Sequence, residues 1–144
     1  MGTLTKANPN AREFVTEILA ETPWWNSLNL IVEFLRSKAV EQVRVEFGFV
    51  LDRFNAGKEQ PSNQVVKLAD LERFIKAGLE EGTIERHGSS DFLFYPSGIE
   101  LTFMLCNDAD LHFASTDFSL LRELGRTLHA SGIRVYDSGR LFGG

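Results

Sequence analysis

The feature that most constrains the fold is an alternation of apolar and polar residues in the second half of the chain, between Asp91 and Tyr136. Apolar side chains recur at every second position in two neighbouring segments, which is typical of β-strands with one buried face. The tripeptide Pro96-Ser97-Gly98 separates these segments and favours a tight turn. Short turns between such strands predict an antiparallel meander. We therefore expect the rest of the chain to extend or cover this sheet.

The predicted fold class is α+β, a single domain with a mainly antiparallel sheet of about five or six strands. The expected strands are residues 43–52, 83–86, 91–95, 99–106, 111–115 and 133–136. Four helices are predicted from apolar residues at helical spacing, and we expect them to pack mostly on one face. Their expected ranges are 11–21, 24–37, 70–81 and 117–130.

The first predicted helix depends on its start signal and on a short apolar stripe. Asn10 is a good N-cap, and Glu13 follows three residues later, as in a capping box. Apolar residues at 14, 15, 18 and 19 then share one helical face. Trp24 and Trp25 begin the second helix. Because adjacent residues cannot both point inward from one helix face, we expect one indole to lie at the rim.

The expected inward positions of the second half are dominated by Phe and Leu. Twelve of the 144 residues are Phe, which has no polar group and therefore suits a core. The residues predicted to be buried are Phe92, Phe94, Leu101, Phe103, Phe113, Leu121, Leu124 and Leu128. The polar positions between them predict an opposite sheet face that stays partly wet. That face, with Glu100, Thr102, Met104 and His112, is a candidate interaction surface.

Length and charge bound the classes of function. A chain of 144 residues fits one domain, and we expect flexible tails at 1–9 and 139–144. The net charge of −5 argues against nucleic-acid binding, which needs a concentrated basic surface. No apolar run is long enough to span a membrane, and the first residues lack the apolar region of a signal peptide. The single Cys106 allows no internal disulfide, so a cytoplasmic location is expected.

One segment could carry chemistry, the run from Cys106 to His112. Asp108, Asp110 and His112 are ordinary ligands for a metal ion, and Cys106 lies beside them. However, Asp and Asn also build tight turns because their side chains bond to their own backbone, which explains the run more simply. Nucleophilic catalysis by Cys106 has no accompanying signature motif. We therefore expect no cofactor and no metal, and a metal-dependent or acid–base enzyme centred on Asp108, Asp110 and His112 is the alternative hypothesis.

The leading hypothesis is a non-enzymatic protein that acts by binding another protein. The aromatic and acidic residues expected to make contacts are Trp25, Tyr95, Glu100 and Tyr136. An acidic chain suits a basic partner, and a homodimer formed through an exposed sheet edge or through the Trp24–Trp25 pair is the other expectation. In size and charge the chain resembles bacterial immunity proteins, which neutralise toxins. This resemblance is one of type and implies a toxin-neutralising inhibitor.

Overall fold

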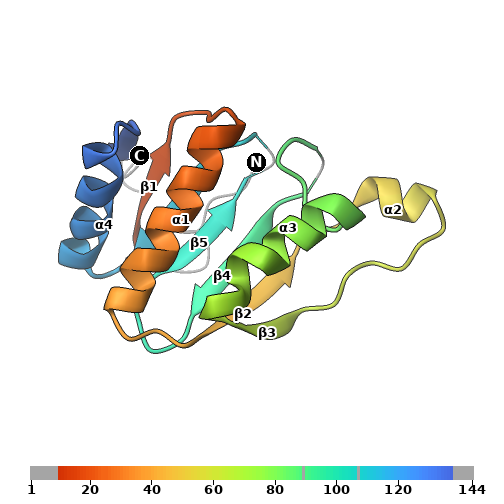
Figure 1. Ribbon diagram of the computed structural model, residues 1–144, viewed down its shortest axis with the longest axis horizontal. Helices are drawn as coiled ribbons and strands as arrows, with labels where there is room; N and C mark the ends of the chain where they lie inside the picture. The colour runs from red at the N-terminus through yellow and green to blue at the C-terminus, as the bar shows by residue number, and fades with distance from the viewer. Residues whose placement is uncertain (1–9, 89, 107, 138–144) are drawn as a thin grey trace.

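A seven-stranded antiparallel sheet with helices on one face forms the framework of the computed structural model (Figure 1), which describes residues 10–88, 90–106 and 108–137. The strand order is β3-β2-β4-β5-β6-β1-β7. The strands are β1 (Arg12–Thr16), β2 (Gln42–Phe47), β3 (Gln64–Lys67), β4 (Phe92–Pro96), β5 (Thr102–Leu105), β6 (Leu111–Ser115) and β7 (Val135–Asp137). The helices are α1 (Glu21–Ser37), α2 (Leu51–Asn55), α3 (Leu71–Glu81) and α4 (Phe118–Ala130), with a 3₁₀ turn η1 (Leu68–Asp70) before α3. The α+β class is confirmed, with one strand more than expected. The predicted tails lie outside the described residues.

Two of the three long helices, α3 and α4, have the end signals that their sequences predict. Asp117 precedes α4, and its Oδ1 accepts a hydrogen bond from the backbone N–H of Leu120 at 3.2 Å. Gly82 follows α3 with a φ of 80°, the left-handed conformation that glycine adopts without a Cβ clash. Helix α1 begins three residues earlier than predicted, at Glu21. Within the described residues, no helix is long and apolar enough to cross a membrane.

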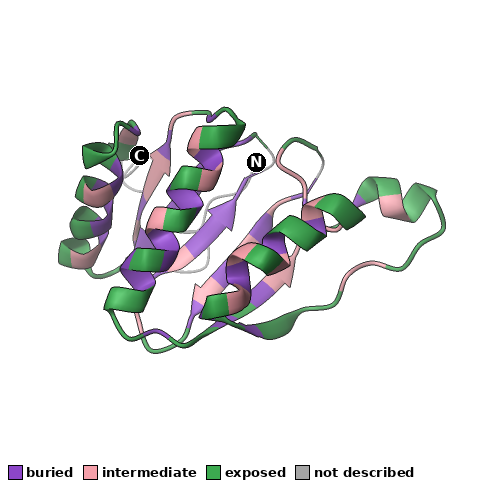
Figure 2. Ribbon diagram, viewed as in Figure 1, coloured by how far each residue is buried: buried purple, intermediate pink, exposed green. Residues whose placement is uncertain are grey.

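The core lies between the sheet and the helices α1, α3 and α4, whose inner faces are buried (Figure 2). All eight residues predicted to be inward are buried. Phe rings cross the sheet in contact, with 4.7 Å between the ring centroids of Phe94 and Phe103 and 6.2 Å between those of Phe103 and Phe113. Trp24 is fully buried while Trp25 is only partly covered, which confirms that one indole lies at the rim. Aromatic packing therefore links the middle strands β4, β5 and β6 to one another within the core.

The predicted helix at 11–21 is wrong, because residues 12–16 form the strand β1. This strand pairs with β6 on one side and with β7 on the other, so it is an inner strand of the sheet. Phe14 lies opposite Phe113 in the register, and its ring reaches the helix-covered face, 5.7 Å from the Phe113 ring. The apolar spacing fitted either element. Two sets of ladder hydrogen bonds and a partly buried ring packed on the core outweigh the weak local preference for a helix.

The predicted strand 43–52 ends at Phe47, five residues early. Gly48 donates from its backbone N–H to Asp91 O at 2.9 Å, and a Cβ at this position would lie only 2.8 Å from the same oxygen. Beyond Gly48 the alternation is inverted, since Val50 is buried and Phe49 is exposed. The chain then forms the short helix α2, which extends beyond the sheet edge (Figure 1). A glycine in a strand pattern can mark such a departure.

Two further corrections concern the region around α3. Residues 83–86, predicted as a strand, instead close the end of α3, because the backbone N–H groups of Thr83 and Ile84 both donate to Gly78 O. Residues 64–67, which were not counted among the sheet members, form the edge strand β3 beside β2. The loss of one predicted strand and the gain of β1 and β3 give the observed seven.

Candidate functional site

The segment predicted to carry chemistry folds into a tight connection between β5 and β6. The backbone N–H of Cys106 donates to Asp110 O at 3.1 Å, and the N–H of Ala109 donates to Cys106 O at 3.1 Å. Ala109 has a φ of 63°, in the left-handed region that non-glycine residues rarely adopt. This turn brings the side chains of Cys106, Asp110 and His112 together, and all three residues are buried.

His112 lies between two carboxylates that come from different parts of the chain. Its Nδ1 is hydrogen-bonded to Oε2 of Glu13 in β1, and its Nε2 is 3.3 Å from Oδ1 of Asp110. Burial by itself lowers the pKa of His112, but the interactions with Asp110, Cys106 and Glu13 outweigh it and raise the pKa to about 11. A proton on this imidazole is therefore strongly held by the surrounding acids.

Cys106 completes the cluster on the side of the turn. Its Sγ lies 3.9 Å from Oδ2 of Asp108, which is itself exposed. One donor atom each from Cys106, Asp110 and His112 lies within 4.8 Å of the other two. Burial raises the pKa of the Cys106 thiol, whereas its interaction with the nearby His112 lowers it. A thiol, an imidazole and a carboxylate at this separation can share a proton or a metal ion.

Sequence reasoning found three members of this cluster and missed the fourth. Glu13 was expected to cap a helix, but it lies 99 residues from His112 in the chain and is buried against it. The prediction of a wet sheet face is wrong at this end, because Met104 and His112 are buried, while Glu100 remains exposed. The signal that could have identified Glu13 is an acidic residue within the five residues of β1, and so short a segment predicts a strand only weakly.

The structure does not bring the residues predicted to bind a partner onto one surface. Trp25 lies on α1, on the helix-covered side of the sheet. Tyr95 faces the opposite side, where its hydroxyl donates to Glu46 Oε1 at 3.0 Å. Tyr136 is on the edge strand β7, four strands away from β4 in the sheet order. Each therefore belongs to a different part of the molecule.

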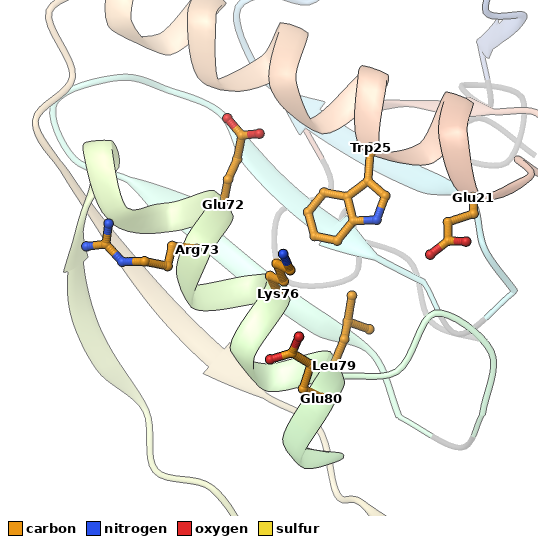
Figure 3. A pocket seen from close by; sticks show the side chains of 7 residues that line it. All are labelled: Glu21, Trp25, Glu72, Arg73, Lys76, Leu79 and Glu80. Atoms are coloured by element: carbon orange, nitrogen blue, oxygen red, sulfur yellow. The ribbon is translucent and has the colours of Figure 1, made fainter.

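Trp25 lines a groove of about 570 Å³ between α1 and α3 (Figure 3). Figure 3 shows its indole directed from α1 toward α3, with Lys76 and Leu79 below it. The groove walls carry three acids and two bases, namely Glu21, Glu72, Glu80, Arg73 and Lys76. Arg73 is paired with Asp70 at 2.6 Å. Because charged side chains of both signs line the walls, the groove selects no single ligand chemistry.

A second exposed feature is the segment of residues 48–56, which contains α2 and which we call the apolar protrusion. Phe49, Leu51 and Phe54 on this segment are exposed, by 55%, 46% and 62%. The rings of Phe49 and Phe54 are in contact, with centroids 5.5 Å apart. Figure 2 shows α2 almost entirely exposed beyond the sheet edge. The sequence suggested burial instead, since Phe49 and Leu51 continued the inward positions of β2.

The comparisons with known proteins do not extend these observations. The chain matches no family model, no curated protein and no solved structure. Its function must therefore be argued from the cluster at His112, the groove and the apolar protrusion.

Proposed function

We propose that the protein acts by binding another protein through the apolar protrusion. The observation that supports this proposal is the concentration of three large exposed hydrophobic residues, Phe49, Leu51 and Phe54, on one short segment. Single apolar side chains on a surface are normal, but a contiguous group is a common mark of an interaction site. Phe is also among the residues enriched in the buried centres of interfaces.

The apolar protrusion is held in place by polar contacts that other residues make, not by the rings of Phe49 or Phe54. The side chain of Gln60 accepts from Val50 N at 2.8 Å and donates to Val50 O at 3.0 Å. Arg53 donates to Glu59 O at 2.8 Å and to Glu81 O, at the end of α3, at 3.3 Å. A segment already ordered in this way loses less conformational freedom when it binds, which favours affinity.

The size of the expected contribution follows from the exposed area. Full burial of a Phe or Leu side chain is worth about 1.5–3 kcal/mol relative to exposure. Since Phe49, Leu51 and Phe54 are each about half exposed, a partner that covers them gains roughly 1 kcal/mol from each. That gain suits an interface in which a small apolar centre is surrounded by polar contacts.

The partner we propose is a basic protein with an apolar cavity rather than a second copy of the chain. At a net charge of −5, two copies repel one another, whereas a basic partner is attracted and steered toward the surface. Neutralisation of a toxin by an immunity-type inhibitor is one activity of this form. A reducing cytoplasm suits the protein, because its only cysteine, Cys106, can form no internal disulfide.

The test compares surface variants in a pull-down from a lysate of the source organism. We expect a protein retained by the wild type to be lost by Phe49→Ser/Phe54→Ser, with affinity reduced roughly 30-fold if about 2 kcal/mol is removed. The matched control is Ile18→Ser, because Ile18 is 71% exposed but lies outside the apolar protrusion. Equal retention by all three proteins would refute the proposal. Light scattering that shows a wild-type dimer and a monomeric double variant would instead assign the surface to self-association.

A further inference from the structure

The buried cluster at the β5–β6 connection has the composition and spacing of a metal site. Cys106, Asp110 and His112 supply a sulfur, an oxygen and a nitrogen within 4.8 Å of one another. Zinc in proteins takes Cys, His and Asp ligands in tetrahedral geometry. Two N or O ligands at about 2.0–2.1 Å from a tetrahedral ion lie about 3.3–3.4 Å apart. The observed separation of His112 Nε2 and Asp110 Oδ1 is 3.3 Å.

The two facing atoms are shielded from solvent, and their 3.3 Å contact is an ion pair that lacks the geometry of a hydrogen bond. Within the described part of the chain, neither His112 Nε2 nor Asp110 Oδ1 makes a hydrogen bond of acceptable geometry, although both are buried. His112 is only 7% exposed. Buried polar atoms normally have a partner, and leaving one without costs about 1–3 kcal/mol. An ion placed between these atoms and the Cys106 sulfur would satisfy both.

Glu13 supplies the support that metal-binding histidines usually have. Its carboxylate hydrogen-bonds to Nδ1 of His112, the ring nitrogen that faces away from Asp110. A carboxylate in this position fixes the ring orientation, keeps the proton on Nδ1 and leaves Nε2 available as a ligand. Because Glu13 lies on β1 and His112 on β6, the ordinary pairing of these strands orients the site.

From these contacts we propose that Cys106, Asp110 and His112 bind one transition-metal ion of the zinc class, with Glu13 as a positioning residue. The thiolate favours zinc over magnesium or calcium, which prefer oxygen ligands. The exposed Asp108, whose Oδ2 is 3.9 Å from the Cys106 sulfur, or a water molecule supplies the fourth ligand. All three principal ligands are buried, so an ion held by them is shielded from bulk solvent.

The decisive experiment uses cobalt(II) as a spectroscopic probe of the purified, metal-depleted full chain. We expect one equivalent of Co²⁺ to produce the intense d–d bands of a tetrahedral ion and a thiolate-to-cobalt charge-transfer band. The chain contains one cysteine, so in a complex of one ion per chain that band can come only from Cys106. The wild type therefore decides the question even if Cys106→Ser fails to fold. Zinc should displace cobalt, abolish the bands and raise the melting temperature until a chelator is added.

Single substitutions distinguish the proposed metal ligands from the residues around them. We expect Cys106→Ser to lose the charge-transfer band and Asp110→Asn to weaken binding. Glu13→Gln should keep the band but lower cobalt affinity about 10–100-fold, as loss of an outer carboxylate does. The control His129→Gln, in the exposed last turn of α4, should bind as the wild type does. No saturable band in the wild type, or binding of one ion by two chains, would overturn the proposal and leave a protonated His112 between Glu13 and Asp110.

Discussion

Replacement of Phe103 by alanine should be among the most damaging single changes in this chain. Phe103 is 1% exposed, and its ring is stacked between those of Phe94 and Phe113. Removing a buried Phe side chain typically costs about 3–5 kcal/mol, because transfer energy is lost and a cavity remains. Unfolding entropy is about 2.1 cal/mol/K per residue, which gives roughly 0.3 kcal/mol/K for 144 residues. A loss of about 4 kcal/mol therefore lowers the melting temperature by about 13 °C.

The matched comparison is Phe54→Ala, the same chemical change on the apolar protrusion. Phe54 is 62% exposed, so we expect its loss to alter the free energy of unfolding by no more than about 0.5 kcal/mol. Both variants can be measured by urea denaturation, followed by far-ultraviolet circular dichroism and by the fluorescence of Trp24 and Trp25. A cost below about 1 kcal/mol for Phe103→Ala, or equal costs for the two variants, would refute the assignment of core and surface.

Two other substitutions test the buried cluster and a helix end. Glu13→Ala should reduce the free energy of unfolding by about 3–5 kcal/mol, because it removes one partner of a buried pair with His112. Glu13→Gln should cost less, and urea denaturation of both variants measures the difference. Equal costs would contradict an ionic role for Glu13. Asp117→Ala should cost about 1 kcal/mol, because α4 loses the side chain that accepts from Leu120 N. An unchanged melting temperature would show that this cap contributes nothing.

The strongest local patterns predicted the structure well. The alternation between residues 91 and 115 gave β4, β5 and β6 in the expected antiparallel order, with every predicted inward Phe buried. Helices α3 and α4 began and ended within a residue of their predictions, since a glycine and a capping aspartate mark their ends. Such elements are predictable because their hydrophobic period and their end signals agree.

Short elements were decided by partners elsewhere in the chain. Residues 12–16 are too few to show a helical or an extended period clearly, and their strand forms because β6 and β7 supply hydrogen bonds on both sides. Residues 49–51 continued the strand pattern of β2, yet contacts of Gly48 with Asp91 and of Val50 with Gln60 direct the chain away from the sheet. Local propensity is weak beside such tertiary contacts.

The cluster at His112 was also predictable in part from the sequence and in part only from the tertiary structure. The sequence alone predicted a tight turn at residues 107–110, which contains Asp110, with Cys106 ending the strand before it and His112 in the strand after it, because turn-forming residues lie between these strands. Only the tertiary structure could decide that they are buried and that Glu13 joins them from 99 residues away. The physical reason is the insertion of β1 between β6 and β7, a long-range pairing that leaves no mark in the sequence near His112.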